Sequence, residues 1–431
     1  MATIPPISTW NELVQQFFPI FTQPKTQVFL RLTIGWILCT GRRTITGILP
    51  FADPSGLRSH DIYHRFFPDA HWDLSAMWNR LAGFLIRTFA PSGTILLDLD
   101  DTVFHHTGPK IEGAGWWRDA VRSTRNRIVY AWGLNLVILT LRVTPPWGGM
   151  PLGLPIRMKV HRKKGDSLTD LALQMLREVS DTFPERAFRV HADGFYASLA
   201  GGLPPRVHLI SRIRRDAVLY DLPPQRRPHQ RGRSRKRGHR LACPEQMARQ
   251  VRSWKRVRTC ERGHTRTRLV YTRLVLWYKV SPTPMLLVLS RDPQGKERDD
   301  FFLSTDLTLG GRIVIEGFAG RWCIEETNRN VKQYLGAQQP QTWKGRGPER
   351  AAAVSLMLYS LVWSWYLQQN KGQQTWTVRP WYATKETPSF RDALTALRRT
   401  LWRPRIISMF EPRSGHHQIL TLLMKLLPEA A

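Results

Sequence analysis

The sequence predicts a mixed α/β protein in which a helical region precedes a sheet-forming region. Three observations indicate this class. The N-terminal region is rich in apolar side chains at helical spacing, the middle of the chain alternates β-branched and aromatic strands with one amphipathic helix, and helical segments return near the C-terminus. With 431 residues, of which 42% are hydrophobic, the chain is long enough for two or three domains with a large core.

Residues 1–90 are expected to form a helical domain. The stretches WNELVQQFFPIF and TQVFLRLTIGWIL are apolar-rich, and Asp73 is placed to cap a helix that runs LSAMWNRLAGFLIRTFA. Arg42 and Arg43 lie in a short turn between two of these helices. Helices joined by arginine-bearing turns suit a DNA-binding domain. On these residues alone, a helical cap packed on the next domain is equally expected.

Residues 91–220 are expected to form a mixed sheet. TILLDLD, residues 127–143 (one or two strands) and residues 154–163 have the β-branched and aromatic composition of strands. Residues 167–183 form an amphipathic helix by their apolar spacing. The stretch RAFRVHADGFYASLAGGL then predicts a strand, an acidic turn and the start of a helix.

Residues 221–305 are expected to form a strand-containing insertion that begins with a basic arm. Residues 221–268 are mostly arginine, proline, glycine and polar residues, and they include the run RGRSRKRG. Proline and glycine disfavour a helix there, and like charges favour an extended chain. We favour an arm that follows DNA phosphates over a mobile solvated loop. The side chains expected to contact phosphates are Arg233, Arg235, Lys236 and Arg237.

Two helices are expected in residues 306–375, one around GGRIVIEGFAGRWCIEETNRNVKQYLG and one through residues 349–369. The second contains 17 consecutive uncharged residues, 351–367, which is at the short edge for a membrane span. Because this stretch holds three serines in a very basic chain, we predict a buried core helix and no membrane. Residues 376–431 predict a basic helical tail. The N-terminus lacks the pattern of a signal peptide, so a cytoplasmic location is expected.

The charge of the chain points to a polyanionic partner. Lys and Arg number 64 against 33 Asp and Glu, which gives a formal net charge of +31. Arginine dominates, and its planar guanidinium suits bidentate phosphate contacts. The simplest partner is nucleic acid, in preference to a surface charged only for solubility.

Acidic residues stand where chemistry is expected, at the ends of predicted strands. The stretch TILLDLDDTVFHHTG contains Asp98, Asp100 and Asp101, and Asp193 follows the strand FRVHA. The letters DLDDT also fit the D-x-D-x-T pattern of phosphatases, in which Asp98 would be the nucleophile and Asp100 the acid/base. That pattern needs a later acidic pair, which the sequence lacks, and it does not explain the charge.

A third acidic position has the most specific surroundings. Arg321, Glu325 and Lys332 are spaced to lie along one stripe of a helix, although spacing alone favours an ordinary surface ion-pair ladder. The stretch resembles the Y-x2-R-x3-E-x6-K signature of DDE transposases from bacterial insertion sequences, the insertion-sequence 4 type and its relatives. Phe318 stands in the place of the tyrosine. DLDDT and HADGFYAS resemble the first and second aspartate motifs, and the resemblance covers roughly residues 40–370.

The resemblance implies a ribonuclease-H-like catalytic domain in which Asp100, Asp193 and Glu325 hold two Mg²⁺ ions, with Mn²⁺ as a substitute. Two such ions can activate the attacking oxygen and stabilise the leaving oxygen of a phosphodiester, and they prefer oxygen ligands. Thr102 is expected to orient Asp100, while Arg321 and Lys332 contact DNA. The resemblance also implies double-stranded DNA ends and target as partners, a dimer on DNA, and a bacterial protein associated with the nucleoid.

Two other functions stay open at this point. A non-catalytic, co-opted DNA-binding protein would keep the basic surface, and a hydrolytic nuclease on the same fold would cut DNA without joining strands. All three acidic positions are filled, so the residues show no sign of inactivation.

Overall fold

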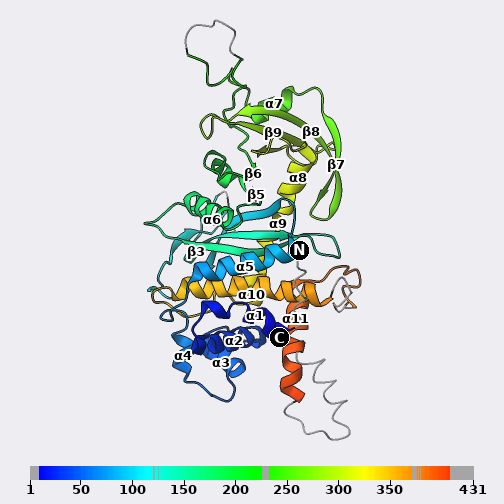
Figure 1. The fold of residues 1–431 in the computed structure, drawn as a ribbon. Coiled ribbons are helices and arrows are strands. Elements are labelled where there is room, and N and C mark those ends of the chain that lie inside the picture. The colour runs from blue at the N-terminus through cyan, green and yellow to red at the C-terminus, as the bar shows by residue number, and fades with distance from the viewer. Residues whose placement is uncertain are drawn as a thin grey trace.

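The computed structural model describes residues 9–407 except for a few internal positions, which are 120–121, 125, 226–232, 371–375, 377 and 379. Figure 1 shows the arrangement as layers. The N-terminal helices lie at one end, two long helices separate them from the sheet, and the insertion extends the molecule at the opposite end.

The N-terminal region is helical, as predicted. Its elements are α1 (Trp10–Gln15), the short η1 (Phe18–Ile20), α2 (Gln23–Leu38), α3 (Ile45–Ala52), α4 (His60–His64) and α5 (Leu74–Phe89). Asp73 caps α5, because its carboxylate accepts hydrogen bonds from the backbone amides of Ser75 and Ala76. These helices are not independent of the rest of the chain, since the indole of Trp36 donates to the carbonyl of Leu335 over 2.8 Å.

A ten-stranded mixed sheet forms the centre of the molecule. Its first strands are β1 (Ile95–His105), β2 (Gly115–Arg118), β3 (Tyr130–Val143), β4 (Leu152–His161), β5 (Phe188–Ala192) and β6 (Val207–Arg212). Strands β4, β3 and β1 pair antiparallel, and β1, β5 and β6 then pair parallel. The order β4-β3-β1-β5-β6 is that of a ribonuclease-H-like sheet. The predicted fold class is therefore confirmed, and β3 is a single strand.

Helices cover both faces of this sheet. The amphipathic helix α6 (Leu168–Thr182) and α5 lie on one face, where Arg157 of β4 bonds to Glu178 of α6 and Asn79 of α5. The helix α10 (Gly347–Asn370) runs against β4, and its Ser360 hydroxyl donates to the carbonyl of Pro155. The residues 351–367 are buried in the core, as predicted. Within the described ranges, no helix has the length and apolarity needed to cross a bilayer.

The insertion continues the sheet past β6. It contains α7 (Pro244–Gln250), β7 (Lys255–Glu261), β8 (His264–Leu276), β9 (Pro284–Arg291) and β10 (Asp300–Ser304), in the sheet order β6-β10-β9-β8-β7. The prediction that residues 221–268 form no helix is therefore wrong, because α7 lies within them, and their last part is extended as paired strands. Pro244 stands in the first turn of α7, where a proline is tolerated, and the β7–β8 pairing satisfies the backbone of the strands. Part of the basic run, 226–232, lies outside the described residues.

The single helix expected around Glu325 is two helices, α8 (Gly311–Gly320) and α9 (Trp322–Tyr334), which meet at Arg321. The close approach of this junction to the sheet requires glycine. A β-carbon at position 320 would lie 2.5 Å from Nη1 of Arg142, and one at position 317 would lie 2.9 Å from Nε2 of His191. The predicted basic tail helix is α11 (Phe390–Ile407), which is held to α2 by Arg398.

Candidate active site

Asp100 and Asp193 come together because β1 and β5 are parallel neighbours. The register pairs Leu99 with Ala192, so the next residue of each strand is an aspartate at the same edge of the sheet. Asp193 is the N-cap of the 3₁₀ helix η2 (Gly194–Gly201), and its carboxylate accepts a 2.9 Å hydrogen bond from the amide of Phe195. The helix start expected after Asp193 is thus a 3₁₀ helix.

Glu325 reaches the same place through an arginine. Arg321 donates from Nη1 to Oδ2 of Asp100 over 3.1 Å and from Nη2 to Oε1 of Glu325 over 2.8 Å. The guanidinium therefore joins the strand carboxylate to the helix carboxylate. The side chains of Asp100 and Glu325 are 19% and 33% exposed, so solvent reaches both.

The carboxyl groups of the site resist ionisation because they are crowded and partly buried. Burial, together with the nearby charges of Asp101 and Asp193, raises the pKa of Asp100 to about 7 in spite of Arg321. Burial and the charge of Asp193 likewise raise the pKa of Asp101, whose carboxylate accepts a 2.9 Å hydrogen bond from the hydroxyl of Tyr196. Crowded, partly buried carboxylates of this kind are stabilised by a cation.

The donor chemistry of Asp100, Asp193 and Glu325 fits a hard divalent cation, because all three supply carboxylate oxygens. In the described part of the chain, however, no three acidic, histidine or cysteine side chains are gathered closely enough to hold a metal ion. At this site Arg321 bridges Asp100 and Glu325.

Lys332 contacts Thr102, which is two residues after Asp100 on the same face of β1. Its ammonium donates to the hydroxyl of Thr102 over 2.7 Å, and burial lowers its pKa to about 8. The hydrogen bond that the structure gives the Thr102 side chain is therefore with Lys332, in place of the expected one with Asp100. Phe318, which stands in the place of the signature tyrosine, packs its ring between Arg212 and Arg321, whose guanidinium carbons lie 5.0 and 5.5 Å from the ring centre.

Comparison with known proteins identifies a family for this chain. Residues 16–279 match the family of DDE superfamily endonucleases, which is more than half of the chain. The chain belongs to this family. Endonucleases of this superfamily use divalent metal ions, and the match ends before α8, so it does not include Glu325.

Among solved structures, this endonuclease is similar to the piggyBac transposase in its synaptic complex with hairpin DNA. The TM-score is 0.40 at 10% sequence identity, and the similarity covers 99% of this chain and 79% of that chain. No curated protein matches the sequence.

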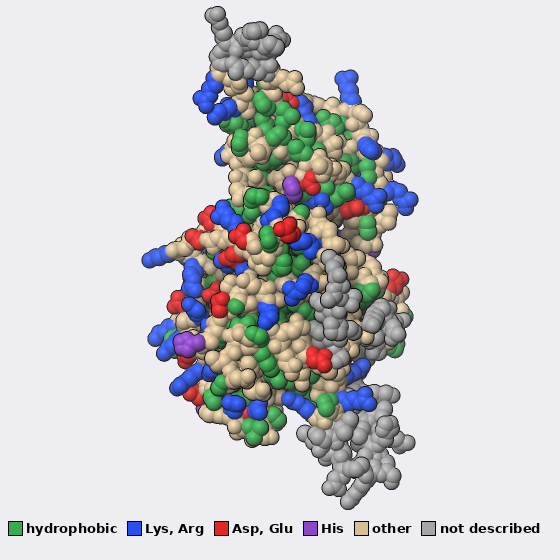
Figure 2. All heavy atoms as spheres, viewed as in Figure 1, with side chains coloured by type: hydrophobic (Ala, Val, Ile, Leu, Met, Phe, Trp, Pro, Cys, Tyr) green, Lys and Arg blue, Asp and Glu red, His purple; other side chains and the backbone are tan. Residues whose placement is uncertain are grey.

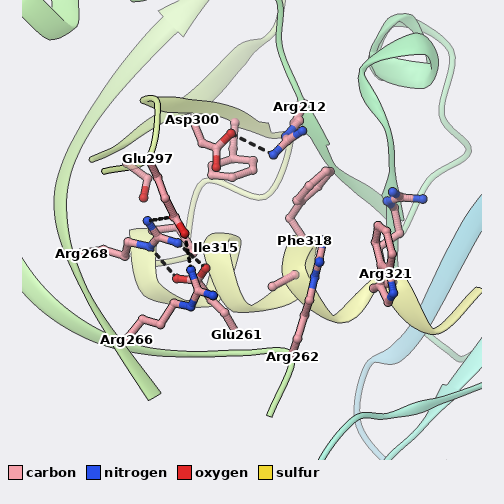
Figure 3. Close-up of a pocket in the computed structure, with 14 residues that line it drawn as sticks. Arg212, Glu261, Arg262, Arg266, Arg268, Glu297, Asp300, Ile315, Phe318 and Arg321 are labelled. Carbon is pink, nitrogen blue, oxygen red and sulfur yellow. Dashed lines mark hydrogen bonds and ion pairs between the residues drawn. The ribbon is translucent and has the colours of Figure 1, made fainter. Parts of the chain in front are cut away.

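A pocket of about 230 Å³ lies between the insertion of the endonuclease and α8 (Figure 3). Its lining includes Arg321, which bridges Asp100 and Glu325. Sequence reasoning did not find the pocket, because its residues come from four separate segments. Most of its arginines are neutralised: Arg268 bonds to Glu261 and Glu297, and Arg212 bonds to Asp300. Arg262, at the tip of the β7–β8 hairpin, stacks over the ring of Trp322 with its guanidinium carbon 3.9 Å from the ring centre.

Asp98, the other candidate nucleophile, is not available for chemistry. Its side chain has no exposed surface and is paired with Arg142 of β3, whose Nε donates to it over 3.0 Å. Nδ1 of His191 lies 3.5 Å from Oδ1 of Asp98. The thiol of Cys323 donates to Oδ2 of Asp98 over 3.1 Å. Burial opposes its ionisation, but Arg142 and His191 outweigh burial and lower its pKa. Nothing in the sequence pairs Asp98 with a residue on β3, so this network was missed.

The predicted DNA-contacting arginines have unequal positions. Arg42 is exposed, whereas Arg43 is 7% exposed and donates to the carbonyl of Tyr334 over 2.9 Å. Arg43 therefore joins the α2–α3 turn to the end of α9. In the basic run, Arg233, Arg235 and Lys236 are exposed, and the guanidinium of Arg237 stacks 4.3 Å over the ring of Tyr220.

Proposed function

We propose that this endonuclease is a transposase of the insertion-sequence kind, which cleaves DNA at element ends and transfers the resulting 3′-hydroxyl into target DNA. One observation supports the proposal above others. Asp100, just past the last residue of β1 that pairs with β5, is joined through Arg321 to Glu325 of a distant helix, and Asp193 follows the last residue of β5. A carboxylate set drawn from two strands and a helix is suited to metal-assisted phosphodiester chemistry.

In this proposal Asp100, Asp193 and Glu325 hold Mg²⁺, which supplies an activated oxygen nucleophile and stabilises the leaving oxygen. The chain's own cations have different tasks. Arg321 neutralises Asp100 and Glu325 in the absence of the metal and is close enough to contact a phosphate once a metal takes over that role. Lys332, held by Thr102, presents its ammonium on the same side of the sheet. Together they would fix the scissile strand.

Double-stranded DNA is the proposed partner, bound by a dimer in the bacterial cytoplasm. Basic side chains lie at both ends of the molecule on the face shown in Figure 2. Arg42 at the helical end and Arg233, Arg235 and Lys236 at the insertion end are exposed. Contacts at both ends would hold a duplex across the carboxylates between them.

The test compares two neighbouring glutamates. Glu325→Gln should abolish Mg²⁺-dependent nicking of DNA that carries the element ends, while the variant still shifts that DNA in a gel. Glu326→Gln is the matched control, because Glu326 pairs with the exposed Arg329 and not with Arg321. Nicking by Glu325→Gln at the wild-type rate would overturn the assignment of Glu325. A wild-type protein that binds but never cuts would favour the non-catalytic alternative, and cutting without joining would favour the hydrolytic nuclease.

The phosphatase alternative has a specific observation against it. A nucleophilic Asp98 would have to reach a phosphate, but its side chain is fully buried and held by Arg142 and His191. We therefore expect no hydrolysis of a generic phosphate monoester. Robust monoester hydrolysis that Asp98→Asn removes would restore the phosphatase.

A further inference from the structure

An aromatic and basic surface lies at the β2–β3 end of the sheet, outside the carboxylate site. Trp116 of β2 and Tyr130 of β3 are 57% and 59% exposed, which is unusual for side chains of this size. The register pairs Trp116 with Trp132 and Arg118 with Tyr130, so the four side chains share one face of the two-stranded ribbon. We call Trp116, Arg118, Tyr130 and Trp132 the β2–β3 platform.

The platform is on the same face of the sheet as the carboxylates. In a strand, alternate residues point the same way, and Asp100 of β1 is paired with Ile138 of β3. Counting back along β3 in steps of two from Ile138 leads to Trp132 and then Tyr130. At about 3.4 Å per residue, Trp132 is roughly 20 Å along β3 from the position opposite Asp100. The rings and the candidate catalytic centre therefore lie on the same face of the sheet, with the buried Leu134 and Leu136 of β3 between them.

The platform is rigid where it meets the core. The indole of Trp132 donates to the carbonyl of Gly108 over 2.9 Å, and the ring centres of Trp116 and Trp132 are 5.8 Å apart in an edge-to-face arrangement. The backbone of Trp132 also accepts a 3.0 Å hydrogen bond from the amide of His106. The exposed Trp116 ring is thus held by its neighbour before any ligand arrives, which lowers the entropy lost on binding.

The charge around the platform favours an anionic ligand. Arg118 is exposed directly across from Tyr130, and Arg127 is exposed just before β3. Neither arginine has an ion-pair partner among the residues that the structure describes, in contrast to the neutralised arginines of the pocket beside α8. Exposed aromatic rings flanked by free guanidinium groups form a surface on which bases stack while phosphates are neutralised.

We propose that the β2–β3 platform binds unpaired DNA bases next to the cleavage site, which deepens the proposed function and rests on it. Bases inside a duplex present only their edges, so an exposed ring can stack on a base only where strands are separated. The ligand class is a single-stranded DNA segment of any sequence, because every base has a stacking face. Because the platform lies on the same face of the sheet as Asp100, we assign it to the strand that flanks the scissile phosphate.

The test uses full-length protein carrying Glu325→Gln and no metal, so that binding is measured without cleavage. Fluorescence anisotropy would compare an oligothymidine strand, a blunt duplex, and the same duplex with a single-stranded tail. Trp116→Ala and Tyr130→Ala should each weaken binding of the oligothymidine and of the tailed duplex roughly tenfold or more, and should leave the blunt duplex unchanged. Trp116→Phe should restore most of the affinity. Trp381→Ala is the control, because Trp381 is 81% exposed and is not part of the platform.

Three outcomes would overturn the proposal. Equal losses on the blunt and the tailed duplex would make the platform a contact to duplex DNA. Unchanged binding together with a smaller sedimentation coefficient of the alanine variants would make it an interface between copies of the chain. Unchanged binding and assembly would leave it without a ligand role. A protein that never cleaves DNA but loses single-strand binding in Trp116→Ala would refute the transposase proposal and keep the platform.

Discussion

Asp98 and Asp100 are the same residue type, two positions apart on the same face of β1, yet they have opposite surroundings. Asp98 is fully buried and permanently paired with Arg142, so its pKa is lowered. Asp100 is partly exposed and shares Arg321 with Glu325, so burial and neighbouring carboxylates raise its pKa to about 7. A carboxylate with its own buried arginine is structural, whereas one that shares its arginine is available to a cation.

The difference extends beyond β1. Asp98, His191 and Cys323 meet in one buried cluster, and each stands two residues before a candidate metal ligand, namely Asp100, Asp193 and Glu325 in turn. The buried cluster therefore connects β1, β5 and α9 directly beneath the three carboxylates. We interpret this cluster as a support that fixes the positions of the three carboxylates relative to one another.

The largest effect is expected when the buried pair is broken. Asp98→Asn leaves Arg142 buried without its counter-charge, which should cost about 3–5 kcal/mol of unfolding free energy. Urea unfolding at pH 7 without metal would measure it, with Glu326→Gln as a surface control that changes little. Because the pKa of Asp98 is lowered on folding, its contribution is present above pH 4 and is lost as the pH falls further. A variant as stable as the wild type would contradict a structural role.

A smaller effect is expected at the shared arginine. Arg321→Ala removes the group that joins Asp100 to Glu325 and should lower Mg²⁺-dependent nicking roughly 10–100-fold without abolishing it. Lys332→Ala should also leave partial activity, because the hydrogen bond that the structure gives the Lys332 ammonium is with the hydroxyl of Thr102. Single-turnover nicking rates would distinguish the partial activity of Arg321→Ala and Lys332→Ala from the complete loss expected for Glu325→Gln. Complete loss in Arg321→Ala would make Arg321 as important as the carboxylates.

Asp100→Asn should raise the stability of the fold, whereas Asp98→Asn should lower it. The folded-state pKa of Asp100, about 7, is above its unfolded value near 4, so its ionisation destabilises the fold as the pH rises through this interval. Asp100→Asn cannot ionise and should be about 0.5–2 kcal/mol more stable than the wild type at pH 8 without metal, with no gain at pH 4. Thermal unfolding at both pH values would check this. The same variant should lose cleavage, and a destabilised Asp100→Asn would place it with Asp98.

The smallest effect is expected at the basic run. Replacing Arg233, Arg235 and Lys236 together by alanine should flatten the dependence of log K on log salt by up to about 2.7, at about 0.9 for each phosphate that the variant no longer neutralises. Arg214→Ala is the control, because Arg214 is equally accessible but paired with Asp216. Affinity for a duplex across a salt series gives the slopes. Identical slopes would remove the run from the DNA-binding surface.

Much of the fold could be predicted from local patterns. The capped helix after Asp73, the strand β3, the core helix through residues 351–367 and the tail helix all follow from periodicity and capping, which depend on neighbouring residues. The assignment of Asp100, Asp193 and Glu325 as catalytic stays a prediction, although the structure brings them to one edge of the sheet. The stripe of Arg321, Glu325 and Lys332 lies on α9, with Arg321 at its N-cap, while Phe318 of the signature is on the separate helix α8.

By itself the sequence determined the alternation of helices and strands, the acidic residue Asp193 at the end of β5 and the basic charge, whereas the expected strand end at Asp100 lies in the middle of β1. The first-aspartate motif favoured Asp100 over Asp98 as the metal ligand, but only the tertiary structure gave Asp98 the partner that makes it structural. That partner is Arg142, which is 44 residues away along the chain and is brought into contact by strand pairing. The tertiary structure also decided that Arg43 is buried and that the second half of the insertion's basic region is a β-hairpin. Periodicity is a property of neighbours, whereas the partner of a buried charge is selected by long-range packing.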